Sequence, residues 1–177
     1  GAEFGWRTGS GNWPTDWPDT WPSTCDVGRG SPTGTIFGTG AKFPEKYRRA
    51  LYACDWALGR IYAVHMTPRG ASWSGEAEVF ARGEPFPVTD AIIAQDGAMY
   101  IVTGGRGTQS GLYRITWKES FDESRTPAPL LSAEQEERRA LEDLHVPRKR
   151  TPDELAQIAR GSTSPDPFLG GAARVAL

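Results

Sequence analysis

Carboxylates beside aromatic side chains, at the ends of short apolar runs, are the first candidates for chemistry. Asp55 follows the apolar run 51–54 and precedes Trp56. This pair suits a sugar, because an aromatic ring stacks on a sugar face while a carboxylate accepts hydroxyl hydrogen bonds. The alternative is a loop carboxylate that caps backbone N–H groups beside a packed Trp. Asp90 has similar alternatives: it orients a ligand hydroxyl or holds a cation, or it caps its loop.

A glycine-rich loop holds the next candidates, Arg106 and Gln109. Its small residues let the backbone approach a ligand closely, so the two side chains could bind a carboxylate or another anion. The alternative is a long hairpin loop with a solvated Arg106. The loop is not a dinucleotide fingerprint, because no helix pattern follows it.

Histidines and cysteines indicate little chemistry, and we predict no metal site. His65 has no second His or Cys at ligand spacing, so we expect a structural His; we expect His145 to be exposed. The basic triplet 148–150 is balanced by nearby acids and is interpreted as a solvated face. Cys25 and Cys54 either form a disulfide or are two small buried residues.

Composition excludes several functional classes. The 177 residues carry a net charge of −2, which argues against a nucleic-acid partner. No apolar run approaches the ~18 residues of a membrane span. Residues 1–40 hold four Trp among many Pro and Gly, without periodicity, and predict long ordered loops. These Trp either pack the loops or stack on sugar; they are Trp6, Trp13, Trp17 and Trp21.

The rest of the chain divides into a β region and a helical region. Strand-like runs occur at 51–54, 59–66, 76–81, 91–94, 98–102 and 111–117. Asp96-Gly97 predicts a hairpin turn. Helices are predicted to begin at Ser132, at Thr151 and at Asp166. The predicted domains are 1–117, a linker at 118–130, and a helical segment at 131–177.

The β region contains an internal repeat. Residues 50–52 align with 98–100, and 59–62 align with 111–113, at a period of about 50 residues. Four short strands per repeat are typical of a β-propeller blade, and about two blades fit in this chain. We therefore expect an excerpt of a longer protein; the alternative is a small β-sandwich with helices.

Several segments resemble a known family. They are residues 3–7, 30–34, 37–44, 54–56, 59–65, 88–90 and 96–100, and most specifically 104–114 (GGRGTQSGLYR). Together they resemble soluble quinoprotein glucose/sorbosone dehydrogenase-type propellers, in the planctomycete-type membrane-bound dehydrogenase branch. Residues 164–168 and 172–177 resemble the first HEAT-type helix of that branch.

The resemblance implies a mainly β fold: the last blades of a six-bladed β-propeller, followed by a short HEAT-like α-helical segment. It implies sugar or alcohol oxidation with pyrroloquinoline quinone and calcium, a catalytic His in an earlier blade, and a periplasmic, cell-envelope or secreted location. Electrons would pass to a downstream c-type cytochrome domain. The Lys that contacts the quinone falls on Ala57 or Leu58, and the Arg pair falls on Pro87 and Thr89. The alternative function is an inactive propeller scaffold that binds carbohydrate or a protein partner, with Asp55, Trp56, Asp90, Arg106 and Gln109 as ligand-binding candidates.

Overall fold

A computed structural model describes residues 21–105, 107–121 and 131–177. The chain divides into two compact units. The sheet unit comprises Val27–Met66 and Gly75–Ala128, and the helical unit comprises Gly1–Asp26, Thr67–Ser74 and Pro129–Leu177. Within the described ranges, no helix is long and apolar enough to cross a membrane.

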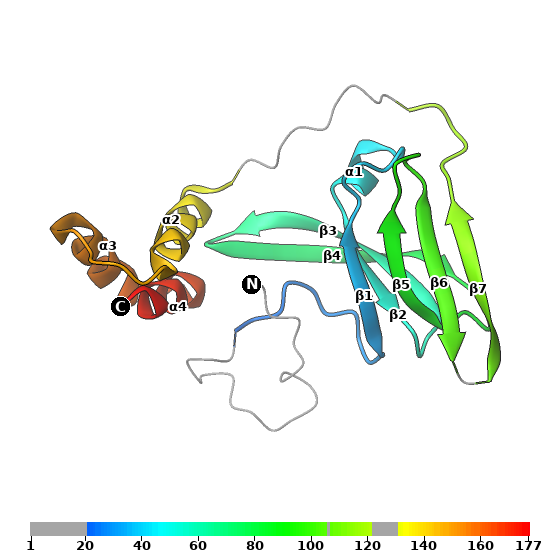
Figure 1. The fold of residues 1–177 in the computed structure, drawn as a ribbon, viewed down its shortest axis with the longest axis horizontal. Helices are drawn as coiled ribbons and strands as arrows, with labels where there is room; N and C mark the ends of the chain where they lie inside the picture. Colours follow the sequence, from blue (N-terminus) through cyan, green and yellow to red (C-terminus); the bar gives the residue numbers. More distant parts are fainter. Residues whose placement is uncertain (1–20, 106, 122–130) are drawn as a thin grey trace. The chain divides into compact units, whose positions relative to one another are not determined.

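The first sheet has four strands in sequence order (Figure 1). They are β1 (Pro32–Phe37), β2 (Leu51–Asp55), β3 (Arg60–Arg69) and β4 (Ser72–Arg82). Strands β1, β2 and β3 pair antiparallel, with Leu51 opposite Phe37 on one side and Val64 on the other. The β2–β3 and β3–β4 connections are short, which favours antiparallel neighbours, whereas the β1–β2 connection contains α1 (Glu45–Arg48).

The second sheet has three antiparallel strands, β5 (Val88–Ile93), β6 (Met99–Gly105) and β7 (Thr108–Ile115). The predicted hairpin turn between β5 and β6 is confirmed. Gly97 has φ +80°, and the Asp96 carboxylate accepts a hydrogen bond from the Ala98 N–H at 3.0 Å. Only glycine adopts that backbone conformation without strain, which fixes the turn at this residue.

The sheet unit has one hydrophobic core, formed by both sheets. Tyr52, Ile61, Met99 and Ile101 are among its fully buried residues. The Thr33 hydroxyl donates to the Val88 carbonyl at 2.9 Å and so connects β1 with β5. The two sheets therefore pack through their first strands.

The prediction of loop for residues 1–40 is wrong in part. Residues 32–37 form β1, whereas loop was expected through residue 40. Pro32 is the first residue of the strand, a position where a missing N–H is tolerated. A short helix, α1 (Glu45–Arg48), was also not predicted. Strand β3 runs to Arg69, past the end of the run predicted at 59–66, and the turn that follows lies at Gly70, which has φ +53°.

The helical unit contains α2 (Ala133–Glu142), the 3-10 turn η1 (Asp143–His145), α3 (Pro152–Ser162) and α4 (Pro167–Ala176). All three predicted helix starts are confirmed: Ser132 and Thr151 open capping boxes, and Asp166 accepts two N–H bonds at the start of α4. Helical spacing brings apolar side chains to one side of each helix. Leu141, Ile158 and Ala173 lie in the resulting core.

The tip of the β3–β4 hairpin belongs to the helical unit and is held by side chains from the helices. Asp166 accepts from the Ala71 N–H at 2.9 Å. The Ser132 hydroxyl donates to the Gly70 carbonyl at 3.0 Å, and the Gln135 amide donates to the Ser72 carbonyl at 2.5 Å. Ala71 is buried in the helical core. The helices therefore hold the hairpin tip both through its backbone groups and through the buried Ala71 side chain.

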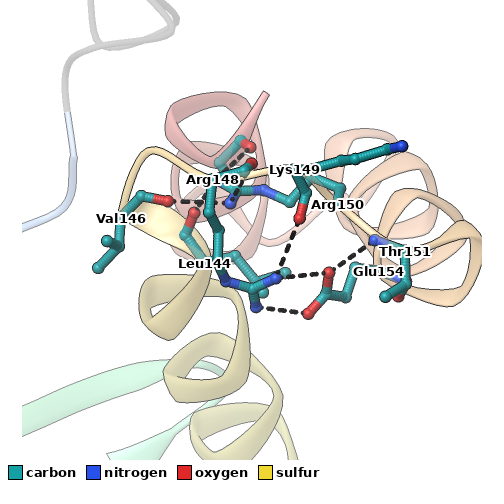
Figure 2. A network of polar contacts seen from close by, with 8 residues as sticks. Leu144, Val146, Arg148, Lys149, Arg150, Thr151 and Glu154 are labelled. Carbon is teal, nitrogen blue, oxygen red and sulfur yellow. Dashed lines mark hydrogen bonds and ion pairs between the residues drawn. The ribbon is translucent and has the colours of Figure 1, made fainter.

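The basic triplet is not simply a solvated face (Figure 2). Arg148 forms two hydrogen bonds with the Glu154 carboxylate, and Arg150 donates to the carbonyls of Leu144 and Val146. These bonds hold the connection between η1 and α3. His145 is half-buried and contacts the Ala172 carbonyl at 2.9 Å, so the expectation of an exposed His145 was wrong.

Candidate functional site

Three connections of the sheet unit gather at one end of the two sheets. They join β2 to β3 (residues 56–59), β4 to β5 (residues 83–87), and the end of β6 at Gly105 to the start of β7 at Thr108. In Figure 1, β5 begins at the end of its sheet where β6 passes into β7. Because neighbouring strands are antiparallel, alternate connections lie at the same end of a sheet. This loop end contains most of the site residues expected from the sequence.

Trp56 joins the loop ends of the two sheets. Its indole N–H donates to the Gly104 carbonyl at 2.7 Å. Gly105, with φ +98°, lies against the Trp56 ring, and an added Cβ would approach that ring to 3.0 Å. Only a residue without a side chain fits there while keeping this backbone conformation. Trp56 is thus a structural connector whose ring also lines a pocket.

Two open pockets meet at this end. The first, of about 310 Å³, is lined by the loop residues 56–59 and 83–87 with Thr108. The second, of about 490 Å³, is lined by Pro85, Pro87, Thr103 and residues 108–113. They share Pro85, Pro87 and Thr108 and form one surface, which we call the loop-end groove. Each pocket is within the size range of small-ligand sites.

Asp55 is buried behind this groove and serves the loop. One carboxylate oxygen accepts hydrogen bonds from the N–H groups of Ser31, Ala57 and Leu58 at 3.0 to 3.1 Å. Its other oxygen lies against Gly30, where an added Cβ would approach it to 2.1 Å, so a side chain at position 30 would clash with the carboxylate. Three charge-assisted bonds leave the carboxylate little capacity for a ligand. Of the two alternatives, the geometry favours the loop cap.

Asp90 is not brought into the groove. It is exposed near the start of β5, and one of its oxygens accepts from the Ala91 N–H at 2.8 Å. Burial, with a smaller contribution from the Asp90 charge, raises the pKa of the Cys54 thiol to about 11. Cys54 is a buried free thiol, so the structure contains no Cys25–Cys54 disulfide. The thiol is therefore protonated at neutral pH and inert.

The glycine-rich loop contributes one described candidate. Gln109 is exposed on β7 and lines the second pocket. Arg106 lies outside the described residues, as do Trp6, Trp13 and Trp17. Trp21 packs edge-to-face on Phe168, with ring centroids 5.0 Å apart, in the helical unit. Trp21 therefore acts as a packing residue there.

The sequence analysis missed the segment that forms the floor of the groove. Residues 84–87 read Glu-Pro-Phe-Pro, and all four line the first pocket. The Phe86 ring contacts the Tyr113 ring edge-to-face, with centroids 5.8 Å apart. The two prolines were a detectable signal, because they rigidify a connection between strands. Their position beside Trp56 depends on pairing between distant strands and was not detectable.

The groove is aromatic and apolar at one end and rich in uncharged polar groups at the other. Trp56, Leu58 and Phe86 line the first pocket, while Thr103, Gln109 and Ser110 line the second. Among the described lining residues, Glu84 is the one charged side chain. The arrangement suits a ligand with an apolar face and several hydroxyl groups.

These residues do not fit the quinone that the resemblance implies. A tricarboxylate needs cations or free N–H groups. The matched positions hold Ala57 or Leu58 in place of the Lys, and Pro87 and Thr89 in place of the Arg pair. The N–H groups of Ala57 and Leu58 already bond to Asp55. Glu84 would repel the ligand's carboxylates. We therefore derive no chemistry through the quinone.

In the described part of the chain, no three His, Cys, Asp or Glu side chains come together in a group that could hold a metal ion. His65 contacts the Glu78 carboxylate at 2.8 Å, and Lys46 pairs with the same oxygen at 3.2 Å. The hydrogen bond from His65, with the one from Lys46, holds the pKa of Glu78 below its usual value. His65 therefore has a polar partner, as expected for a structural His.

Comparison of the chain with known protein families, with curated proteins and with solved structures gives no match.

Proposed function

We propose that the sheet unit is a pair of consecutive β-propeller blades and that its loop-end groove binds a neutral carbohydrate. The observation that carries the binding proposal is the lining of the groove: aromatic and apolar side chains beside uncharged hydrogen-bonding groups. A sugar ring packs its C–H face on such a surface while amide and hydroxyl groups bind its hydroxyls.

The arrangement of the sheets supports the propeller proposal. Each sheet is antiparallel and follows sequence order, and their first strands pack together, as the inner strands of neighbouring blades do. The outer face of the second sheet exposes Ile92, Val102 and Leu112, a surface that another blade would cover. The three short helices that follow are then the start of a HEAT-like arm.

Calorimetric titration with neutral gluco-, xylo- and mannooligosaccharides tests the binding proposal. We expect Gln109→Ala to weaken binding about five- to tenfold, because it removes an uncharged hydrogen-bonding group. Gln95→Ala is the matched control, since Gln95 is also exposed but lies in the β5–β6 turn, at the other end of the strands. Equal effects of the two substitutions, or no binding of any oligosaccharide, would refute the groove as the site.

The sequence resemblance supports a second candidate, a quinone-dependent dehydrogenase of sugars or alcohols. Its test is dye reduction in the presence of pyrroloquinoline quinone, calcium and an aldose. Quinone-dependent turnover would replace the binding proposal with the enzymatic one. The lining of the groove leads us to expect neither quinone binding nor turnover.

A further inference from the structure

The helical unit contains a pocket of its own, which shares no residue with the loop-end groove. It has a volume of about 250 Å³ and lies where α2 meets the tip of the β3–β4 hairpin. Residues 71–73 of the hairpin form one wall, and Leu131 and α2 form the other, so the whole lining belongs to the helical unit. We call it the α2 pocket. Its volume is just below the range of drug-sized ligand sites, so it suits a small group.

The charge in the α2 pocket comes from one side of α2. The helix contributes Gln135, Arg138, Arg139 and Glu142, which follow one another at spacings of three and four residues and therefore lie on the same side of the helix. Two arginines and one glutamate give the pocket a net charge of +1. It therefore favours an anion, and a singly charged one more than a dianion, which Glu142 would repel more strongly.

The two arginines have different roles. The Arg138 Nε donates to the Glu142 carboxylate at 2.7 Å, and its Nη1 donates to the Ala71 carbonyl at 3.2 Å. Its guanidinium also lies 5.2 Å from the centre of the Phe168 ring, so Arg138 is part of the packed wall. Arg139 is exposed, and its guanidinium has no ion pair or hydrogen bond within 21–105, 107–121 and 131–177. A guanidinium with free donors can bind a carboxylate through two parallel hydrogen bonds.

The hairpin wall supplies an apolar surface and an unused hydroxyl. Trp73 is half-buried and lines the pocket, as does Leu131. The Ser72 hydroxyl beside them is buried and has no hydrogen-bond partner among the residues that the structure describes. A buried hydroxyl without a partner is unusual and costs free energy. A ligand oxygen in the pocket would supply that partner once the hydroxyl turns toward it.

We propose that the α2 pocket binds a carboxylate that is carried next to an apolar group. Arg139 binds the carboxylate, Trp73 and Leu131 pack against the apolar group, and the Ser72 hydroxyl donates a further hydrogen bond. A free acylated amino acid and the C-terminal residue of a peptide both have this chemistry. The proposal is independent of the loop-end groove and of carbohydrate binding.

Nuclear magnetic resonance titration of the full chain with N-acetyl-leucine and with N-acetyl-leucinamide tests the proposal. The two compounds differ in the carboxylate, and the readout is the indole N–H signal of Trp73, which is identified by its loss in Trp73→Phe. We expect saturable shifts with the acid and binding at least about tenfold weaker with the amide, because only the acid has a charge for Arg139. A peptide ending in leucine distinguishes the sources: tighter binding than the acid indicates a peptide end, and equal binding indicates a small acid.

Substitution of Arg139 tests the assigned cation. Arg139→Gln should remove the preference for the acid over the amide, while helical circular dichroism stays unchanged because the side chain is exposed. Arg160→Gln is the matched control, since Arg160 is an exposed arginine of the same unit but lies on α3. Three results would each overturn the proposal: no saturable shift of Trp73 at up to about 10 mM acid, equal binding of acid and amide, or equal effects of the two arginine substitutions.

Discussion

At the residue scale, one type of side chain has two roles in this chain, and only burial and partners distinguish them. Asp55 follows the predicted strand 51–54, and Asp90 precedes the predicted strand 91–94. Both were candidates for ligand binding. The structure buries Asp55 against three N–H groups and leaves Asp90 exposed with one. Sequence alone could identify both carboxylates but not their partners, because Ser31 reaches Asp55 only through the pairing of β1 with β2.

This difference predicts unequal effects on stability. We expect Asp55→Ala to lower the free energy of unfolding of the sheet unit by about 3 kcal/mol, because three part-buried N–H groups lose the buried carboxylate that accepts their hydrogen bonds. Asp90→Ala should cost less than about 1 kcal/mol. Urea denaturation of both variants measures this. Similar losses would show that Asp55 is not the cap of its loop.

A second prediction at this scale concerns pH. Hydrogen bonds from Arg148 and from the Thr151 N–H lower the pKa of Glu154 from 4.5 to about 2 (Figure 2). A carboxylate with a lowered pKa in the folded state stabilises it above the unfolded pKa. This contribution should be lost as pH falls from about 4.5 to about 2.

Thermal unfolding, followed by the helical circular dichroism signal at pH 6, 4 and 2.5, measures this loss of stability as a fall in melting temperature. Glu154→Gln removes the titrating group, so its melting temperature should depend less on pH over this interval. If the variant and the unmodified chain lose stability in parallel, the Arg148–Glu154 pair does not account for the pH effect.

At the element scale, local signals predicted helix starts and a hairpin turn, while pairing between distant residues determined the rest. Capping residues predicted the starts of α2, α3 and α4. Such starts are visible in the sequence because a cap bonds to backbone groups only two or three residues away. Strand β1 lacked such a signal: its Thr and Gly residues read as loop, and it forms because β2 provides a partner. The reach of the β3–β4 hairpin into the helical unit was likewise not predictable from local pattern.

Asp166 connects α4 with the β3–β4 hairpin, and substitutions can separate the contributions of its two contacts to stability. It caps α4 with one oxygen and accepts the Ala71 N–H with the other. We expect Asp166→Ala to destabilise the helical unit by about 2 kcal/mol, since both contacts are lost. Asp166→Ser keeps a helix cap and should recover about half of that loss.

Denaturation followed by helical circular dichroism measures both substitutions. Asp153→Ala is the control, because Asp153 is an exposed acid in the first turn of α3 and does not cap it. If Asp166→Ser recovers the full stability, the bond to the hairpin backbone contributes nothing, and the helical unit holds the hairpin by other contacts.

At the scale of the whole molecule, the sequence repeat predicted about two four-stranded blades, and capping residues predicted the helices. The structure shows one four-stranded and one three-stranded antiparallel sheet followed by three short helices, so the prediction was correct for the first sheet and had one strand too many for the second. The repeat could place the loop connections at one end of the sheets, but it could not show which side chains line the groove there. Gln109 was predicted and lies in it; Asp90 was predicted and does not. The Glu-Pro-Phe-Pro floor was recognisable only once the strands were paired.

We propose an uncharged carbohydrate as the ligand of the loop-end groove. The most direct test of this proposal is calorimetric titration of the unmodified chain with neutral and uronic-acid oligosaccharides of matched length, at low and high salt. We expect a neutral oligosaccharide to bind at least about tenfold more tightly, with little dependence on salt, because the described lining carries only the negative charge of Glu84. Tighter binding of the uronic-acid oligosaccharide, weakening as salt rises, would contradict the account.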